Sequence, residues 1–251
     1  MPTIAEQLSK RGLATGIIAT SSIQHATPAS FYAHVKSRRM YEEITEFAPN
    51  SGINFFAGGG LKFFKNRKDG KDLLEEMRAK GYDVITDQLP TTPSKNNELI
   101  LLAEDGMPKM SDGRGDFLPN ATKLALEKLS KNEKGFFLMV EGSQIDWGGH
   151  DNDADYLIGE LLDFDKTLGV ALDFAKQNGE TLIIVTADHE TGGFTLASDG
   201  SDYNKIKPSF STPGHSATMV PVFAEGPGAT LFNGIYESNE IYHKMMELLK
   251  K

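Results

Sequence analysis

Phe136-Phe-Leu-Met-Val140 is an unbroken apolar run, and Glu141-Gly-Ser-Gln-Ile-Asp146-Trp-Gly-Gly-His150 follows it directly. A short apolar run of this kind predicts a buried strand. Acidic side chains just beyond such a strand stand where an open α/β sheet places its ligand site. Asp146 and His150 are four residues apart, so they share a face if a helical turn begins there. Because carboxylate oxygen and imidazole nitrogen suit zinc, the segment predicts a metal site.

Two further segments repeat this pattern. Thr181-Leu-Ile-Ile-Val-Thr186 is another apolar run, and it leads directly into Asp188-His189. Gly214-His215 stands just before the apolar run 219–223. The candidate ligands at these strand ends are therefore Glu141, Asp146, His150, Asp188, His189 and His215. Two clustered cations can clamp the attacking and leaving oxygens of a phosphoryl transfer, at a separation of about 3.5–4 Å.

The rest of the chain alternates predicted strands with predicted helices. This pattern indicates an α/β fold with a mainly parallel central sheet and helices on both faces. We expect strands at 13–20, 53–57 and 98–103, and helices at 71–80, 121–131 and 237–251. Thr3 with Glu6 predicts a capping box for a first helix that ends at Gly12. We see no repeat and no interior boundary, so we expect residues 1–251 to form a single domain.

Four segments carry more specific expectations. Thr27-Pro28 predicts the start of a helix that continues to about Arg38. The basic stretch 62–71 is interpreted as a solvated loop. Residues 155–177 predict one long helix with a break near Gly169. The polar, Gly/Pro/Ser-rich segment 198–214 predicts a mobile loop that carries His215.

Composition narrows the class of protein. The 251 residues contain 39% hydrophobic and 24% charged residues, which is typical of a soluble globular chain. A net charge of −9 argues against a nucleic-acid surface. The absence of cysteine excludes disulfides. The sequence shows neither a signal peptide nor an apolar run long enough to span a bilayer.

At these motifs the chain resembles the alkaline phosphatases. The stretches that carry the resemblance are Gly12-Leu-Ala-Thr-Gly16, Gln24-His-Ala-Thr-Pro28, Leu129-Ser-Lys-Asn-Glu-Lys-Gly-Phe-Phe137, Val140-Glu-Gly142, Val185-Thr-Ala-Asp-His189 and His215. The resemblance implies a metal-dependent phosphatase that hydrolyses phosphate monoesters with two zinc ions and one magnesium ion. It also implies a periplasmic or extracellular location, and it leaves a homodimer open.

The resemblance further implies which residues hold each ion. The first zinc would take Asp146, His150 and His215, and the second zinc would take Asp188 and His189. Magnesium would take Glu141 and Thr27, although Thr27 also fits a helix cap and the two roles are compatible. Arg38 matches the arginine that grips phosphate, a role suited to its bidentate fork.

Four positions depart from well-studied relatives. His25 stands where the bacterial enzyme has aspartate and animal enzymes have histidine, next to the magnesium site. Trp147 follows Asp146 where a lysine or histidine is usual. Gly148-Gly149 replaces a bulkier pair, from which we expect a more open pocket.

The sequence lacks two groups of the family. There is no Asp-Ser-Ala motif for the serine nucleophile, and the aspartate that bridges the second zinc and the magnesium is missing as well. The chain is therefore interpreted as a C-terminal portion that lacks the N-terminal strand, which would leave an exposed sheet edge. We expect zinc binding at the three-ligand site, weaker occupancy of the incomplete two-ligand site, and little or no turnover. The alternatives are a non-catalytic metal- or phosphate-binding protein derived from the enzyme, and a hydrolase that uses metal-bound hydroxide directly.

Overall fold

The computed structural model describes residues 1–249, so the last two residues of the predicted C-terminal helix lie outside the described part. The chain divides into two compact units, which are described separately. The first comprises Met1–Ser143 and Asp163–Thr167, and the second comprises Gln144–Leu162 and Leu168–Lys251. The expectation of a single domain stays a prediction.

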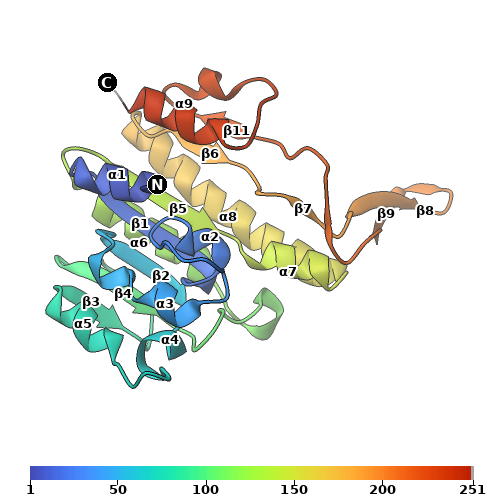
Figure 1. Ribbon diagram of the computed structural model, residues 1–251. Coiled ribbons are helices and arrows are strands. Elements are labelled where there is room, and N and C mark those ends of the chain that lie inside the picture. The colour runs from blue at the N-terminus through green and yellow to red at the C-terminus, as the bar shows by residue number, and fades with distance from the viewer. Residues whose placement is uncertain (250–251) are drawn as a thin grey trace. The chain divides into compact units, whose positions relative to one another are not determined.

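A five-stranded sheet forms the centre of the first unit, and all of its neighbouring strands are parallel. The strand order is β3-β4-β2-β1-β5. The bounds are Ala14–Ser22 (β1), Phe55–Gly59 (β2), Tyr82–Ile85 (β3), Asn97–Leu101 (β4) and Phe136–Glu141 (β5). The predicted parallel sheet is confirmed (Figure 1). Strand β3 was not predicted, because its four residues are too few to show a period.

Helices cover both faces of this sheet. Consecutive residues of a strand point to opposite faces, and both sets of side chains are apolar here, so each face forms a core with its helices. Ile17 and Phe56 belong to the core beneath one set of helices, while Ile18 and Phe55 face α6 on the other side. The helices are α1 (Ile4–Lys10), α2 (Ala26–Ala29), α3 (Tyr41–Thr45), α4 (Lys62–Lys65), α5 (Leu73–Ala79) and α6 (Phe117–Leu129), with short 3₁₀ turns η1 (Ala48–Asn50) and η2 (Met110–Asp112). The predicted two-sided covering is confirmed.

The capping signals place the ends of α1 and α5. Thr3 and Glu6 form the predicted reciprocal capping box. Gly12 and Gly81 follow the two helices with φ of +88° and +84°, a left-handed conformation that glycine adopts without strain. The predicted boundaries of both helices are confirmed within two residues.

The predicted helix from Thr27 to Arg38 is wrong, since α2 ends at Ala29. His25 is the N-cap residue, and Thr27 lies inside the turn, so Thr27 is not a helix cap. The buried Tyr32 turns the chain inward, and its hydroxyl donates to the Ile23 carbonyl at 3.0 Å. Burial of this side chain therefore overrides the local helical pattern.

The basic stretch 62–71 is not simply a solvated loop. It begins with the helical turn α4, and Arg67 within it is buried. The Arg67 guanidinium pairs with Glu46 at 3.0 Å and with Asp69 at 2.5 Å, and it donates to the Glu42 carbonyl at 2.8 Å. The stretch is thus anchored to the first unit by one buried cation.

The second unit consists of helices and three small antiparallel sheets. Its elements are α7 (Gln144–His150), α8 (Ala154–Asn178), β6 (Ile183–Val185), β7 (Glu190–Thr191), β8 (Thr195–Asp199), β9 (Asp202–Ser209), β10 (His215–Ser216), β11 (Phe223–Glu225), η3 (Ala229–Phe232) and α9 (Glu240–Leu248). The sheets pair β10 with β7, β11 with β6, and β8 with β9. Residues Asp163–Thr167 of α8 belong to the first unit.

Two expectations for the second unit are wrong. Helix α8 is continuous through Gly169, because a single glycine costs only about 1 kcal/mol in a helix that is well capped. Asp153 caps its start and Gly179 ends it with φ of +72°. The predicted mobile loop 198–214 is instead largely the β8–β9 hairpin, which turns at Gly200 with φ of +64° (Figure 1). The Asp-Gly dipeptide at this turn was the overlooked signal.

Within residues 1–249, no helix is both long enough and apolar enough to cross a bilayer.

Candidate metal centre

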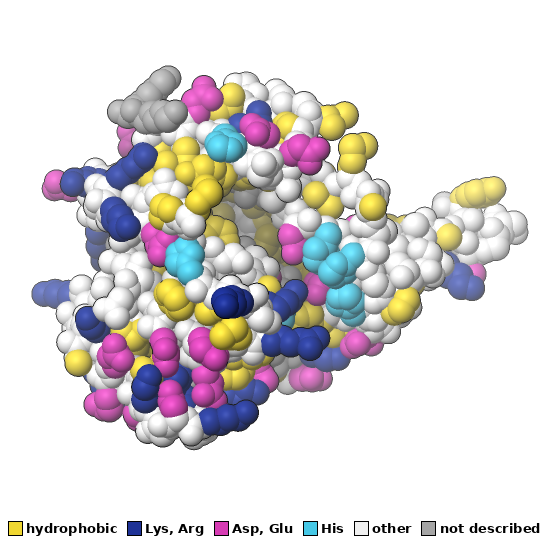
Figure 2. All heavy atoms as spheres, viewed as in Figure 1, with side chains coloured by type: hydrophobic (Ala, Val, Ile, Leu, Met, Phe, Trp, Pro, Cys, Tyr) yellow, Lys and Arg dark blue, Asp and Glu magenta, His cyan; other side chains and the backbone are white. Residues whose placement is uncertain are grey.

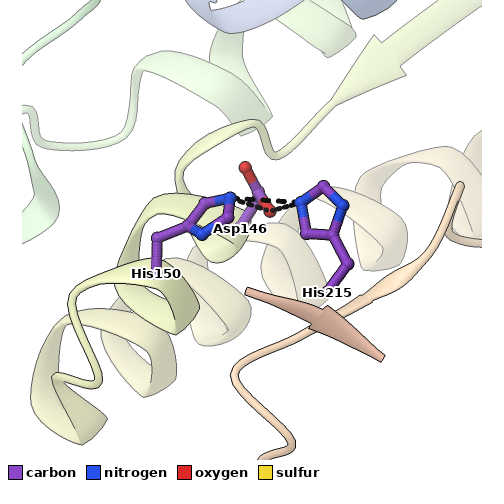
Figure 3. A group of neighbouring side chains, drawn as sticks. All are labelled: Asp146, His150 and His215. Carbon is purple, nitrogen blue, oxygen red and sulfur yellow. Dashed lines mark hydrogen bonds and ion pairs between the residues drawn. The ribbon is translucent and has the colours of Figure 1, made fainter. Parts of the chain in front are cut away.

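Three predicted ligands converge in the second unit. His150 Nε2 lies 3.4 Å from Asp146 Oδ1, and His215 Nε2 lies 3.6 Å from the same oxygen. The two Nε2 atoms are 3.1 Å apart. Figure 3 shows the three side chains pointing toward one another, two from α7 and one from β10. Helix α7 confirms that Asp146 and His150 lie one helical turn apart.

A two-residue ladder brings His215 to this helix. His215 pairs with Thr191, and Ser216 pairs with Glu190, in the β10–β7 sheet. Next to this ladder the Gly192 N–H donates to the Gly214 carbonyl at 2.9 Å. Backbone pairing, rather than apolar packing, therefore fixes where the third ligand stands.

The hydrogen bonds of His150 define which ring nitrogen faces the cluster. Its Nδ1 lies 2.7 Å from the carbonyl oxygen of Pro213. A carbonyl only accepts, so Nδ1 carries the proton in the neutral ring and Nε2 carries the lone pair. Nε2 then faces the carboxylate of Asp146, which also only accepts. A cation between these atoms satisfies both groups.

The spacing of the three atoms fits zinc. With metal–ligand distances of about 2.0–2.1 Å, neighbouring ligand atoms of a tetrahedral zinc site lie about 3.3 Å apart. The observed separations of 3.1, 3.4 and 3.6 Å scatter around this value. Two imidazoles and one carboxylate are also a donor set that leaves a fourth position open, as in catalytic zinc sites.

Asp188 and His189 lie beside this cluster. Asp188 Oδ2 is 3.1 Å from His189 Nε2, so the two predicted ligands of the second zinc face each other. The rings of His189 and His215 stack with their centroids 3.6 Å apart. Figure 2 shows histidine side chains (cyan) gathered on the surface close to α7 and β7.

The glycine pair of α7 serves close packing. A Cβ atom at Gly148 would lie 2.6 Å from the Leu157 backbone nitrogen, and one at Gly149 would lie 2.8 Å from the Thr191 carbonyl oxygen. The expectation that these glycines open the pocket is therefore wrong. They let α7 approach α8 and β7 more closely than a residue with a Cβ atom would allow.

Thr191 and Glu190, which no local sequence motif marks, contribute polar contacts beside the cluster. The Thr191 hydroxyl lies 2.5 Å from Asp146 Oδ1. The Ser216 hydroxyl donates to Glu190, and this hydrogen bond lowers the pKa of the Glu190 carboxyl. A signal was available for Thr191, since residues two apart in an extended segment share a face and Thr191 follows His189 by two.

The predicted magnesium ligands belong to the first unit. Glu141 is the last residue of β5, and Thr27 lies in α2, which packs against β1 and β5. Glu141 Oε2 accepts a hydrogen bond of 2.5 Å from the Ser143 hydroxyl, which itself accepts from the Ser21 N–H at 3.1 Å. Carboxylate and hydroxyl oxygens suit magnesium, so the chemistry of this pair fits the ion.

The other predicted site residues are exposed or half-buried. The Arg38 side chain is exposed and lies in a turn of the first unit. His25 is half-buried at the start of α2. Trp147 is half-buried in α7, next to Asp146 in the second unit.

A family model described as alkaline phosphatase matches residues 1–211. The chain belongs to the alkaline phosphatase family. The matched span ends before His215. The position of His215 beside Asp146 and His150 therefore comes from the structure and not from the family model. The fold of the family agrees with the parallel sheet described above.

The similar proteins are alkaline phosphatases. The chain is 40% identical over 230 residues to alkaline phosphatase 3 of Bacillus subtilis (strain 168), a match that covers 88% of this chain and 48% of the relative. It is 53% identical to the alkaline phosphatase of the Antarctic bacterium TAB5, with a TM-score of 0.96 over 98% of this chain and 75% of that one. The cold-active enzyme of Shewanella sp. is 31% identical, with a TM-score of 0.90 over 100% of this chain and 79% of that one. The chain thus spans about half the length of the two Bacillus subtilis relatives that it matches.

Proposed function

We propose that this chain carries the metal-binding part of a phosphatase that hydrolyses phosphate monoesters with two zinc ions and one magnesium ion. The observation that carries the proposal is the convergence of Asp146, His150 and His215 at separations that suit zinc. Family membership supplies the reaction class.

Each group of residues has its own part in this proposal. Bound divalent cations supply the positive charge that stabilises the attacking and leaving oxygens in phosphoryl transfer. Asp146, His150 and His215 would hold the first zinc, and Asp188 with His189 would hold the second. Glu141 and Thr27 would hold magnesium, for which a TAB5 alkaline phosphatase variant offers a parallel. That protein is 52% identical to this chain and has Mg bound in its M3 site.

Arg38 is proposed to bind phosphate. Its guanidinium offers two parallel N–H donors at the spacing of two phosphate oxygens. The side chain is exposed, so it is accessible to a ligand from solvent. The chain as a whole is acidic, and this local cation would offset that charge where the anion binds.

We further propose that the 251 residues alone turn over little substrate. They contain no Asp-Ser-Ala motif, and no cysteine replaces the serine nucleophile. The missing nucleophile also favours a second candidate function, that of a metal- and phosphate-binding protein without catalytic activity. A periplasmic or extracellular location and assembly into a homodimer are part of the proposal by family membership. A single domain is part of it because the sequence shows no interior boundary.

The test of metal binding is zinc analysis of the chain purified without chelator. We expect bound zinc in the wild type and its loss in His215→Ala. His243→Ala is the matched control, since His243 lies in α9 away from the cluster, and it should keep the metal. Wild-type protein that holds no zinc would overturn the proposal.

Two assays then separate the phosphatase from the non-catalytic candidate. p-Nitrophenyl phosphate hydrolysis should be close to background, and a fast reaction abolished by His215→Ala would contradict the low-turnover proposal. Calorimetry with inorganic phosphate on zinc-loaded protein should show binding that Arg38→Ala weakens. Arg39→Ala, at the neighbouring exposed arginine, should leave phosphate affinity unchanged. Absence of phosphate binding would remove the non-catalytic candidate.

A further inference from the structure

Thr191 touches every segment that carries a ligand of the second unit. Its backbone pairs with His215 in the β7–β10 ladder. Its hydroxyl oxygen lies 2.5 Å from Asp146 Oδ1 and 3.2 Å from His189 Nδ1. Its side chain also packs closely on Gly149, the residue before His150, since a Cβ atom added at Gly149 would lie only 3.0 Å from Thr191 Cγ2. The Thr191 side chain is buried, while the Asp146 and His189 side chains that it contacts are partly exposed.

The chemistry of the partners fixes the direction of both hydrogen bonds. An ionised aspartate only accepts, so the single hydroxyl proton of Thr191 goes to Asp146. The lone pairs of the hydroxyl then accept from His189, which requires a proton on Nδ1. His189 Nε2 then keeps its lone pair, and since the Asp188 carboxylate 3.1 Å away also only accepts, this arrangement is satisfied by a cation between the two atoms.

We propose that Thr191 is a positioning residue that joins the two zinc ligand sets, through the chain His189 Nδ1–H to Thr191 Oγ1–H to Asp146 Oδ1. The proposal rests on the proposed function, because the ligand sets are those assigned there. Thr191 orients the Asp146 carboxylate toward the first zinc. It also selects the tautomer of His189 that presents Nε2 to the second.

Threonine suits this position better than its close analogues. Its β-branched side chain has few χ1 rotamers, and the tight packing against Gly149 restricts them further. Serine keeps the hydroxyl and loses the methyl contact. Valine keeps the shape and loses both hydrogen bonds, which makes it the informative substitution.

The experiment compares Thr191→Val with Thr191→Ser in the full chain. Long-range proton–nitrogen NMR of the imidazoles, at a pH where they are neutral, reports which nitrogen of His189 carries the proton. Competition with a chromogenic chelator reports zinc affinity. We expect Thr191→Val to lose the defined Nδ1–H tautomer and to bind zinc about 10- to 100-fold more weakly. Thr191→Ser should keep the tautomer and most of the affinity.

The outcomes separate this proposal from the proposed function. A Thr191→Val protein with wild-type zinc affinity and an unchanged His189 tautomer overturns the role of Thr191 and leaves the zinc sites intact. Equal losses in the valine and serine variants also overturn it, since they would indicate packing alone. Wild-type protein that binds no zinc overturns the proposed function. In that metal-free protein, an Nδ1–H tautomer of His189 that is lost in Thr191→Val would still support the role of Thr191, whereas an Nε2–H tautomer directed at Asp188 would overturn it.

Discussion

Each of the two units of this chain is stabilised internally by a different kind of interaction. Of the apolar side chains described as buried, 34 belong to the first unit and five to the second. The first unit has a sheet with an apolar core on each face. The second unit holds its ligands with short ladders, a glycine pair and polar side chains such as Thr191. Burial of apolar surface stabilises the first unit, whereas the metal site is proposed to complete the second.

This difference in stabilising interactions separates a unit that depends on apolar burial from a unit that is proposed to depend on bound metal. A parallel sheet with both faces covered buries apolar surface on each side, and this burial stabilises it without a bound ligand. A cluster of facing lone pairs is unfavourable without a cation, and binding free energy at such a site becomes folding free energy. The comparison therefore predicts that core substitutions act on the first unit and that metal acts on the second.

The largest effect is expected from Phe56→Ala in β2. Phe56 is fully buried and packs edge-to-face on Tyr32 with ring centroids 5.3 Å apart. Its truncation should cost the first unit about 3–5 kcal/mol of unfolding free energy. Urea-dependent hydrogen exchange of β1 and β2 measures this loss. The control Phe223→Ala, at a side chain that is 64% exposed in β11, should cost less than about 0.5 kcal/mol. Equal costs at the two positions would break the comparison.

The second effect is that of zinc on the second unit. Zinc at about 100 times its dissociation constant should raise the unfolding free energy of the second unit by about 2.7 kcal/mol. We expect slower hydrogen exchange in α7, β7 and β10, with no change in β1 and β2. Removal of the metal with a chelator should reverse the protection. Zinc that protects both units equally, or that protects His215→Ala as well as the wild type, would contradict this prediction.

A smaller effect is expected from Ser143→Ala, which tests the polar link at the carboxyl end of the first sheet. The buried Ser143 hydroxyl connects the Ser21 N–H to the Glu141 carboxylate. Its loss should cost about 1–3 kcal/mol, because a buried donor loses its partner. Urea denaturation measures the change, with Ser111→Ala at an exposed serine as the control. A cost no larger than that of the control would show that the first unit tolerates loss of this link.

The smallest effect is the acid dependence of the Arg67–Asp69 pair. The hydrogen bond from the Arg67 guanidinium lowers the pKa of Asp69 from 3.8 to about 2. Asp69 therefore contributes stability that is fully present above its ordinary pKa and is lost as pH falls from about 4 to about 2. Asp69→Asn should make the unfolding free energy of the first unit fall less steeply over this range. Identical slopes in the two proteins would exclude a contribution from the pair.

Local signals in the sequence were sufficient for much of the first unit. The apolar runs of β1, β2, β4 and β5 predicted buried strands, and Thr3 with Glu6 predicted the start of α1. Local patterns were insufficient where distant contacts decide the conformation. The length of α2 depends on the burial of Tyr32, and the role of Arg67 depends on Glu46, 21 residues away. Gly169 also shows that a weak breaker does not interrupt a helix with strong caps at both ends.

The candidate site divides in the same way. The spacing of Asp146 and His150, and the adjacency of Asp188 and His189, are fixed by the sequence, because one helical turn or one peptide bond joins each pair. Only the tertiary structure decides that His215 lies beside them, since it is 65 residues beyond His150 and a two-residue ladder brings it there. The place of Thr191 depends on that ladder and on the close approach that Gly149 permits. Sequence determines contacts that the covalent chain makes unavoidable, and packing and backbone pairing determine the others.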